Sequence, residues 1–326
     1  MPGFIVHPGS SFRYYSYYLE GFSRSLGARV KFSTEGMPPL LGGKSGLPVV
    51  LPDGGRVFIA ADDHSTVDPD WLGWCHVYGQ VNYDAAGAPE DPRVISIGPS
   101  FGVRWRSTPY LAAYVIRAGL ASSRWRDVPA RLRDWGQHQR ERSTVDAYVP
   151  GESDPDYLFF LASWWDRHPE ANADRVLFME AASSIPSLTV EGGFVSSRRS
   201  LVAPPFPHGP VAHSTFLSST VRSVAVFNAP AVHDCLGWKL GEFLALGKAI
   251  ISVPLLRGMP EPLVHGEHIH FVDGSPGSFT EALRLLRADV VYRKQLEHNA
   301  RAYWERLLAP TAVVNRLVAA RRSAPG

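Results

Sequence analysis

The sequence contains only two cysteines, Cys75 and Cys235, in 326 residues. Two are too few for a disulfide framework or a cysteine-rich zinc site, and they suit a reducing compartment. A single disulfide between them remains an alternative. No run approaches the roughly 18 apolar residues of a membrane span, and the N-terminus lacks the pattern of a secretion signal. We therefore expect a cytoplasmic protein whose membrane contact is at most peripheral, through Arg321 and Arg322 near the C-terminus.

An excess of charge of one sign is also missing. The 33 basic and 31 acidic residues are interspersed and give a formal net charge of +2, which leaves no broad electrostatic footprint for nucleic acid. We expect no nucleic-acid partner.

Several catalytic signatures are absent as well. The sequence has no G-x-S-x-G elbow, no G-x-x-x-x-G-K-[ST] phosphate loop and no G-x-G-x-x-G after the first expected strand, which disfavours serine hydrolysis and dinucleotide redox chemistry. An Asp-Pro-Asp triplet occurs at 68–70 and at 154–156, but its central proline favours a turn over a metal site. The histidines show no compact spacing of zinc ligands, so we expect no metal and no bound cofactor.

Apolar runs and helical patterns alternate along the chain. Strands are expected around 3–7, 28–34, 54–64, 73–83 and 93–102, with helices between and after them, and a second series begins near 157. Such alternation indicates mainly parallel sheets covered by helices on both faces. We expect an α/β protein with two Rossmann-like, doubly wound domains that face each other across a cleft.

A segment rich in charge, proline and glycine, 139–156, separates the two series. We place an acceptor-binding domain at 1–145 and a donor-binding domain at 146–308. A final helix, 309–326, is expected to pack back on the first domain. A homodimer is compatible with this arrangement.

The segment GWKLGEFLALGKAII, 237–251, reads as a helix that runs into a short strand. Leu240 and Phe243 can pack inward, while Lys239 and Glu242 lie three residues apart near the helix start. A helix N-terminus attracts phosphate, and Lys239 would add a cation there. Glu242 could accept hydrogen bonds from two ribose hydroxyls. The alternative is an ordinary surface Lys–Glu pair.

The region 223–301 resembles the donor half of nucleotide-sugar-dependent glycosyltransferases of the GT-B fold. Those enzymes often carry a Glu, seven residues, and then Glu-x-x-Ala-x-Gly-x-(Pro or Ala)-(Val or Ile), whose second half matches EFLALGKAII here. The resemblance implies that Glu242 contacts the donor ribose, and that Gly237, Trp238 and Lys239 receive the diphosphate. Asp234 stands where the family has its first Glu, which lies near the transferred sugar, and this shorter carboxylate is a departure from the pattern.

Other positions have two interpretations each. Arg175 could reach the diphosphate or be a charge on a helix surface. The segment VEGGF, 190–194, is expected as a turn whose glycines let the backbone approach a ligand, or as a plain turn at the end of a strand. Tyr14 or Tyr17 could stack on an acceptor sugar if either lies on an exposed face.

In the first half, His7 ends the first strand, and Asp63 and His64 end the run GGRVFIAADDH. In an inverting reaction, one of these residues would be the general base that takes the proton of the acceptor hydroxyl. In a retaining reaction no such base is required. His7 has the alternative of a strand-end histidine bonded to backbone.

These observations predict a metal-independent glycosyltransferase of carbohydrate biosynthesis that moves a sugar from a nucleoside diphosphate sugar to the hydroxyl of a small-molecule or glycan acceptor. The chief alternative is a catalytically inactive GT-B-like protein that binds a nucleotide or a glycan. A phosphorylase or an epimerase on the same fold is a third. The sequence leaves open the nucleotide base, the sugar, the acceptor, the stereochemical outcome and the oligomeric state.

Overall fold

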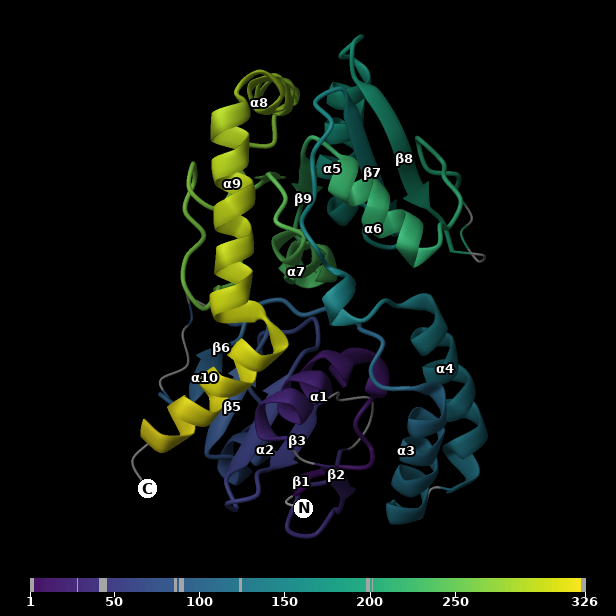
Figure 1. Cartoon of the computed structure of the whole chain (residues 1–326), viewed down its shortest axis with the longest axis vertical. Coiled ribbons are helices and arrows are strands. Elements are labelled where there is room, and N and C mark those ends of the chain that lie inside the picture. The colour runs from purple at the N-terminus through teal and green to yellow at the C-terminus, as the bar shows by residue number, and fades with distance from the viewer. Residues whose placement is uncertain are drawn as a thin grey trace. The chain divides into compact units, whose positions relative to one another are not determined.

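The computed structural model describes residues 3–27, 29–40, 46–84, 87, 91–122, 125–197, 200 and 202–323. The chain forms two compact units (Figure 1). Unit 1 comprises residues 1–147, 257–260 and 306–326, and unit 2 comprises 148–256 and 261–305. Both combine helices with mainly parallel sheets, which confirms the expected α/β class.

Unit 1 contains a six-stranded sheet, an N-terminal helix, a helical hairpin and the C-terminal helix. Its elements are β1 (Gly3–Val6), α1 (Phe12–Leu26), β2 (Arg29–Phe32), β3 (Leu47–Val50), β4 (Arg56–Ala60), α2 (Pro69–Trp74), β5 (Val77–Gln80), β6 (Val94–Ser96), α3 (Thr108–Ala121), η1 (Trp125–Asp127), α4 (Val128–Glu141), η2 (Val145–Ala147) and α10 (Pro310–Ser323).

The strand order in this sheet is β2-β1-β3-β4-β5-β6. Strand β3 pairs antiparallel with β1 and with β4, while the other neighbours pair in parallel. The sequence prediction missed β3 and is wrong in making β4 the third strand. Because β3 runs opposite to both neighbours, β1 and β4 still point the same way. Their carboxyl ends, which carry His7 and residues 61–64, therefore lie at one edge of the sheet.

Helix α1 packs against α10, and most of its aromatic residues are buried. Tyr17 is fully buried, and its hydroxyl donates to the Leu308 carbonyl at 2.6 Å. The interpretation of Tyr17 as an exposed stacking residue is therefore wrong, whereas Tyr14 is 44% exposed. Gly21 lets the two helices approach closely, since a Cβ at this position would lie 2.2 Å from the Pro310 carbonyl oxygen.

Unit 2 is built from five parallel strands and their connecting helices. Its elements are β7 (Tyr157–Ser163), α5 (Glu170–Ser183), β8 (Thr189–Val195), α6 (His213–Arg222), β9 (Val226–Asn228), η3 (Val232–Asp234), α7 (Trp238–Ala245), β10 (Ile250–Ser252), β11 (His270–Phe271), α8 (Pro276–Ala288) and α9 (Val290–Tyr303); a π-helical turn, Trp304–Leu308, follows α9.

Strand β8 pairs with β7, and β11, β10 and β9 pair in that order in a second sheet. Strand β9 lies beside β7, where the Val224 N–H donates to the Tyr157 carbonyl at 2.8 Å. The resulting strand order is β8-β7-β9-β10-β11, so the chain first adds a strand on one side of β7 and then adds the others on its opposite side. Doubly wound folds have such an order, and they bind ligands beyond the carboxyl ends of their strands. Phe178 of α5 stacks on Phe227 of β9 with ring centroids 4.4 Å apart, and this contact fixes the helix on the sheet.

The glycine pair at 192–193 lies inside strand β8, so the prediction of a turn there is wrong. Both glycines have positive φ angles, 105° and 147°. A Cβ at Gly192 would lie 1.7 Å from the Phe160 carbonyl oxygen, and one at Gly193 would lie 2.1 Å from that of Phe206. The close backbone approach therefore serves the strand's own neighbours.

Replacing Gly21 with alanine tests the contact between α1 and α10. The added methyl group meets the Pro310 carbonyl, and we expect the free energy of unfolding to fall by about 1–3 kcal/mol. The control is Gly73→Ala in α2, where a Cβ meets no heavy atom within 4 Å. That change should leave the melting temperature equal or slightly raised. A Gly21→Ala protein that melts like the unmodified chain would contradict the close approach.

Candidate functional site

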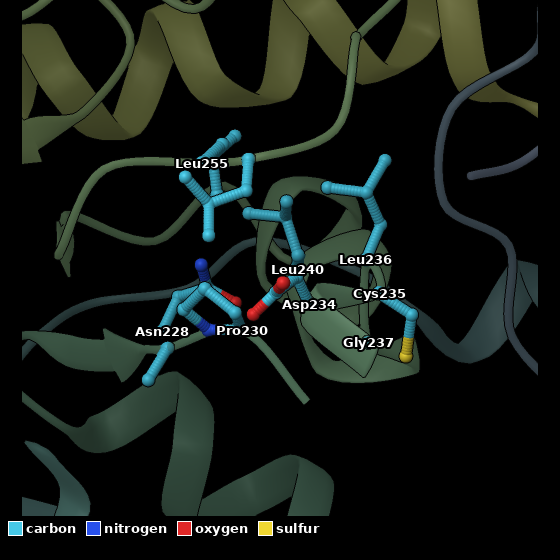
Figure 2. A pocket seen from close by; sticks show the side chains of 10 residues that line it. Asn228, Pro230, Asp234, Cys235, Leu236, Gly237, Leu240 and Leu255 are labelled. Atoms are coloured by element: carbon cyan, nitrogen blue, oxygen red, sulfur yellow. The ribbon is translucent and has the colours of Figure 1, made fainter. Parts of the chain in front are cut away.

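A small depression lies at the carboxyl ends of β9 and β10, beside the start of α7 (Figure 2). It is open to solvent, and all its lining residues belong to unit 2. They are mostly apolar, with one carboxylate: Asn228, Ala229, Pro230, Asp234, Cys235, Leu236, Gly237, Leu240, Leu255 and Leu256. Both cysteines of the chain are buried free thiols.

The strand ends behind the depression are joined by side-chain hydrogen bonds. Asn228, at the end of β9, donates from Nδ2 to Ser252 Oγ at 2.9 Å. The Ser252 hydroxyl donates in turn to the Val253 carbonyl at 2.7 Å. Both side chains are buried, so these bonds satisfy polar groups and keep the ends of β9 and β10 together.

Arg175 fixes the other wall of the depression. Its guanidinium donates to the Pro230 carbonyl at 3.0 Å and to the Ala229 carbonyl at 3.3 Å, and it also contacts the Ala171 carbonyl. Burial lowers the pKa of this guanidinium, which nevertheless stays charged. The structure thus places Arg175 behind the chain segment that lines the depression.

The turn between β9 and α7 is strained. His233 and Asp234 both have left-handed backbone angles, with φ of 58° and 60°. Left-handed conformations of residues other than glycine cost about 1–3 kcal/mol each and concentrate at functional sites. In this turn they bring the Asp234 carboxylate to the depression, among Pro230 and Leu240 (Figure 2).

Gly237 caps the N-terminus of α7, and Trp238 is the first helical residue. A Cβ at Gly237 would meet only the Cβ of Ala231, at 4.0 Å, so the space beside the helix start is open. The φ of Gly237 is −73°, an angle that any residue adopts. The depression therefore meets the N-terminus of a helix, the end that carries the partial positive charge of the helix dipole.

Lys239 and Glu242 do not form a surface pair, which removes that alternative. The Lys239 Nζ lies over the Phe216 ring, 4.3 Å from its centroid. Glu242 is only 3% exposed, and its Oε1 accepts from the Tyr148 hydroxyl at 2.9 Å and lies 3.3 Å from His213 Nε2. Neither residue lines the depression, and neither does Trp238.

The catalytic candidates of unit 1 lie at the carboxyl edge of its sheet. His7 is 9% exposed, and its Nδ1 accepts from the Gly9 N–H at 2.9 Å, which leaves the proton of the neutral ring on Nε2. Asp63 and His64 are exposed. The neighbouring Asp62 accepts from the His64 N–H at 3.3 Å, and burial raises the pKa of its carboxyl group.

Sequence reasoning did not assign roles to Tyr148 and His213. Both precede the matched motif by at least 29 positions and share no spacing with it, so only the fold brings them to Glu242. Asp62 stands next to Asp63 in the sequence, and only its burial distinguishes it. Within the described ranges, no group of three or more histidine, cysteine, aspartate or glutamate side chains is arranged to hold a metal ion.

Replacing Glu242 with alanine tests its structural bond to Tyr148. The change leaves a buried tyrosine hydroxyl without its carboxylate, so we expect the free energy of unfolding to fall by about 1–3 kcal/mol. Tyr148→Phe should then cost less in the Glu242→Ala protein than alone, because both changes remove one interaction. Glu281→Ala, on the exposed face of α8, is the control. Additive effects of the two changes in thermal unfolding would argue against the bond.

No protein-family model and no curated protein matches the sequence. Solved structures that are similar to the chain include glycosyltransferases and a putative UDP-N-acetylglucosamine 2-epimerase from Listeria monocytogenes. One, from Rickettsia africae, is 12% identical, with a TM-score of 0.45 over 76% of this chain and 63% of that one, so the chain spans less than two thirds of that enzyme. Anabaena HepE, solved with UDP and glucose, is 11% identical, with a TM-score of 0.39 over 82% of this chain and 99% of that one. A DNA-modifying β-glucosyltransferase, studied with uridine diphosphoglucose, is 11% identical, with a TM-score of 0.45 over 98% of both chains. At these values the likeness assigns no residue and no substrate to this chain.

Proposed function

We propose that the chain is a glycosyltransferase that moves a sugar from a nucleoside diphosphate sugar to an acceptor hydroxyl. The observation that carries this proposal is the depression of unit 2, where a carboxylate and a helix N-terminus lie side by side at the carboxyl ends of parallel strands. A nucleotide sugar needs both groups, because its phosphates are anionic and its sugar offers hydroxyl donors.

In this proposal the diphosphate binds at the start of α7, where the space beside Gly237 is open and the helix dipole is positive. The developing charge of the leaving diphosphate is where such fixed donors lower the barrier most. Lys239 would leave the Phe216 ring to add its charge, and the partly buried cation of Arg175 supports the same wall from behind. No metal ion is assigned to this step.

In this scheme Asp234 binds the sugar. A carboxylate beside phosphate is repulsive, so the sugar ring occupies the space between Asp234 and the helix start. Its oxygens accept hydrogen bonds from sugar hydroxyls, and Leu240 and Leu255 cover apolar parts of the ring. Glu242 is given a positioning role, since its bond with Tyr148 holds α7 in place.

For an inverting reaction, the carboxyl edge of unit 1 offers the general base. The candidates are His7, Asp63 and His64. The Nδ1 lone pair of His7 accepts a hydrogen bond from the Gly9 N–H, so this ring would have to change tautomer before it accepted a proton. His64 is exposed and neighbours Asp62, whose raised pKa brings that carboxyl group closer to neutral pH. We assign the base to the 62–64 segment.

Ligand-induced changes in melting temperature test the proposal. The chain is screened with UDP, GDP, TDP and CDP, and one of them should raise the melting temperature by mass action. Gly237→Asp should abolish that rise, because the new carboxylate takes the phosphate position at the helix start. The ligand-free protein should stay equally stable, or gain roughly a few tenths of a kcal/mol, because aspartate is a better N-cap than glycine.

The control is Gly277→Asp, the same substitution in the first turn of α8, where a Cβ meets no heavy atom within 4 Å. It should leave the nucleotide response intact. A response that survives Gly237→Asp contradicts the assigned phosphate position. Saturable nucleotide binding with no release of sugar from any matching donor would instead favour the inactive binding protein.

A further inference from the structure

The segment from Arg104 to Arg142 is far more basic than the rest of the chain. It contains nine arginines, no lysine and three acidic residues, a net charge of +6 in a protein whose total is +2. The remaining sequence is therefore net negative. This segment contains the α3–α4 hairpin at one side of unit 1 (Figure 1).

Helix α3 is apolar on all sides. Arg117 is the single charged residue in its sequence TPYLAAYVIRAGLA. One face is buried and includes Leu111, Tyr114 and Val115. The opposite face carries Pro109, Ala113, Ile116 and Leu120, all exposed and spaced four, three and four residues apart, which we call the α3 stripe. Ile116 and Leu120 are 46% and 68% exposed.

An apolar helix with one uncovered face implies a partner. A helix that is hydrophobic all round is normally buried in a large core or a membrane. With 14 residues, α3 is only about 21 Å long, and no helix among the described residues is long and apolar enough to cross a bilayer. The α3 stripe therefore suits a surface that the helix lies against.

The inner faces of the hairpin are fixed by one aromatic cluster. The ring centroid of Phe12 in α1 lies 5.3 Å from that of Trp135 in α4 and 6.1 Å from that of Tyr114 in α3. The ring centroids of Tyr114 and Trp135 are 5.7 Å apart. Because both helices turn these residues toward α1, the α3 stripe and the outer face of α4 are both directed away from it.

The outer face of α4 carries two exposed arginines. Arg133 and Arg140 lie seven residues apart, so they share this face, and we call them the arginine line. They lie opposite the buried Trp135 and Gln139. Arg126, also exposed, precedes the helix in η1, and Leu132, next to Arg133 in sequence, is 36% exposed.

We propose that the α3–α4 hairpin binds an anionic membrane surface, with the α3 stripe in contact with the acyl boundary and the arginine line on lipid phosphates. Aliphatic residues next to exposed arginines are the composition of helices that lie in a membrane interface. A symmetric contact between two copies would bring two positive segments together, which disfavours a dimer through this face. Nucleic acid would match the charge but gives Ile116 and Leu120 no apolar partner.

The C-terminal arginine expected at a membrane has another partner. Arg321 binds Asp53 through two hydrogen bonds of 2.7 and 2.6 Å, in a bidentate ion pair within unit 1. The hairpin is therefore a distinct surface from the one that the sequence suggested.

Vesicle co-sedimentation of the full chain tests this proposal without any nucleotide. Vesicles of equal parts phosphatidylglycerol and phosphatidylcholine should bind the protein, vesicles of phosphatidylcholine alone should not, and binding should weaken as salt rises from about 0.1 to about 0.5 M. Arg133→Gln with Arg140→Gln should reduce partitioning by about fivefold for each arginine. Ile116→Ser with Leu120→Ser should reduce it about tenfold or more.

Matched controls separate this surface from general effects of charge and hydrophobicity. Val290→Ser with Val291→Ser removes two exposed apolar residues of α9, and Arg167→Gln with Arg284→Gln removes two exposed arginines of unit 2; both pairs should keep vesicle binding. Equal binding by the Ile116/Leu120 variant overturns the proposal, as does absence of binding to the anionic vesicles. A dimer in light scattering that the same variant dissociates, or preferential binding to duplex DNA, would also overturn it.

Discussion

The hydrogen bonds from the Arg175 guanidinium to the carbonyls of Ala229 and Pro230 hold the turn on which the candidate site depends. These carbonyls lie where β9 has ended and α7 has not begun, so no backbone ladder holds them. A buried guanidinium offers five donors in a planar fork and can satisfy several carbonyls at once. With this segment fixed, the strained turn at His233 and Asp234 can bring a carboxylate beside a helix N-terminus.

Glu242 shows how one side chain can serve structure where its motif suggests ligand binding. Its carboxylate is nearly inaccessible and bonded to Tyr148, beside His213 at the start of α6. This arrangement ties α7 to two chain segments that are distant in sequence. The orientation of the α7 N-terminus therefore depends on a buried polar cluster, in which removing one member leaves the others unsatisfied.

Local patterns in the sequence predicted the elements of unit 2 well. The run YLFFLAS and the helical spacing of Phe178 and Ala182 follow from burial against one sheet, and the structure has β7 and α5 there. Strand β3 was missed because LPVV is short, contains a proline and follows a sequence rich in glycine, all of which weaken a strand signal. The glycines of β8 look like a turn, yet the close neighbouring carbonyls of Phe160 and Phe206 require them inside a strand.

The site was less predictable than the fold because its geometry comes from contacts across long sequence distances. The sequence indicated Asp234, Gly237 and Lys239 by their place around α7, and the structure puts the first two at the depression. It could not indicate that Lys239 would lie on Phe216, or that Arg175 would bind carbonyls 54 and 55 residues away. Such pairings follow from the packing of α5 and α6 on the sheet, which no local pattern encodes.

Backbone amide shifts on titration with a nucleoside diphosphate test the central claim most directly. In ¹⁵N-labelled protein, the diphosphate that binds should shift the amides of Gly237, Trp238 and Lys239 most, together with those of residues 229–235. This result would place the phosphates at the start of α7. Saturable binding whose largest shifts lie elsewhere in unit 2 or in unit 1, with these amides unmoved, would contradict the account.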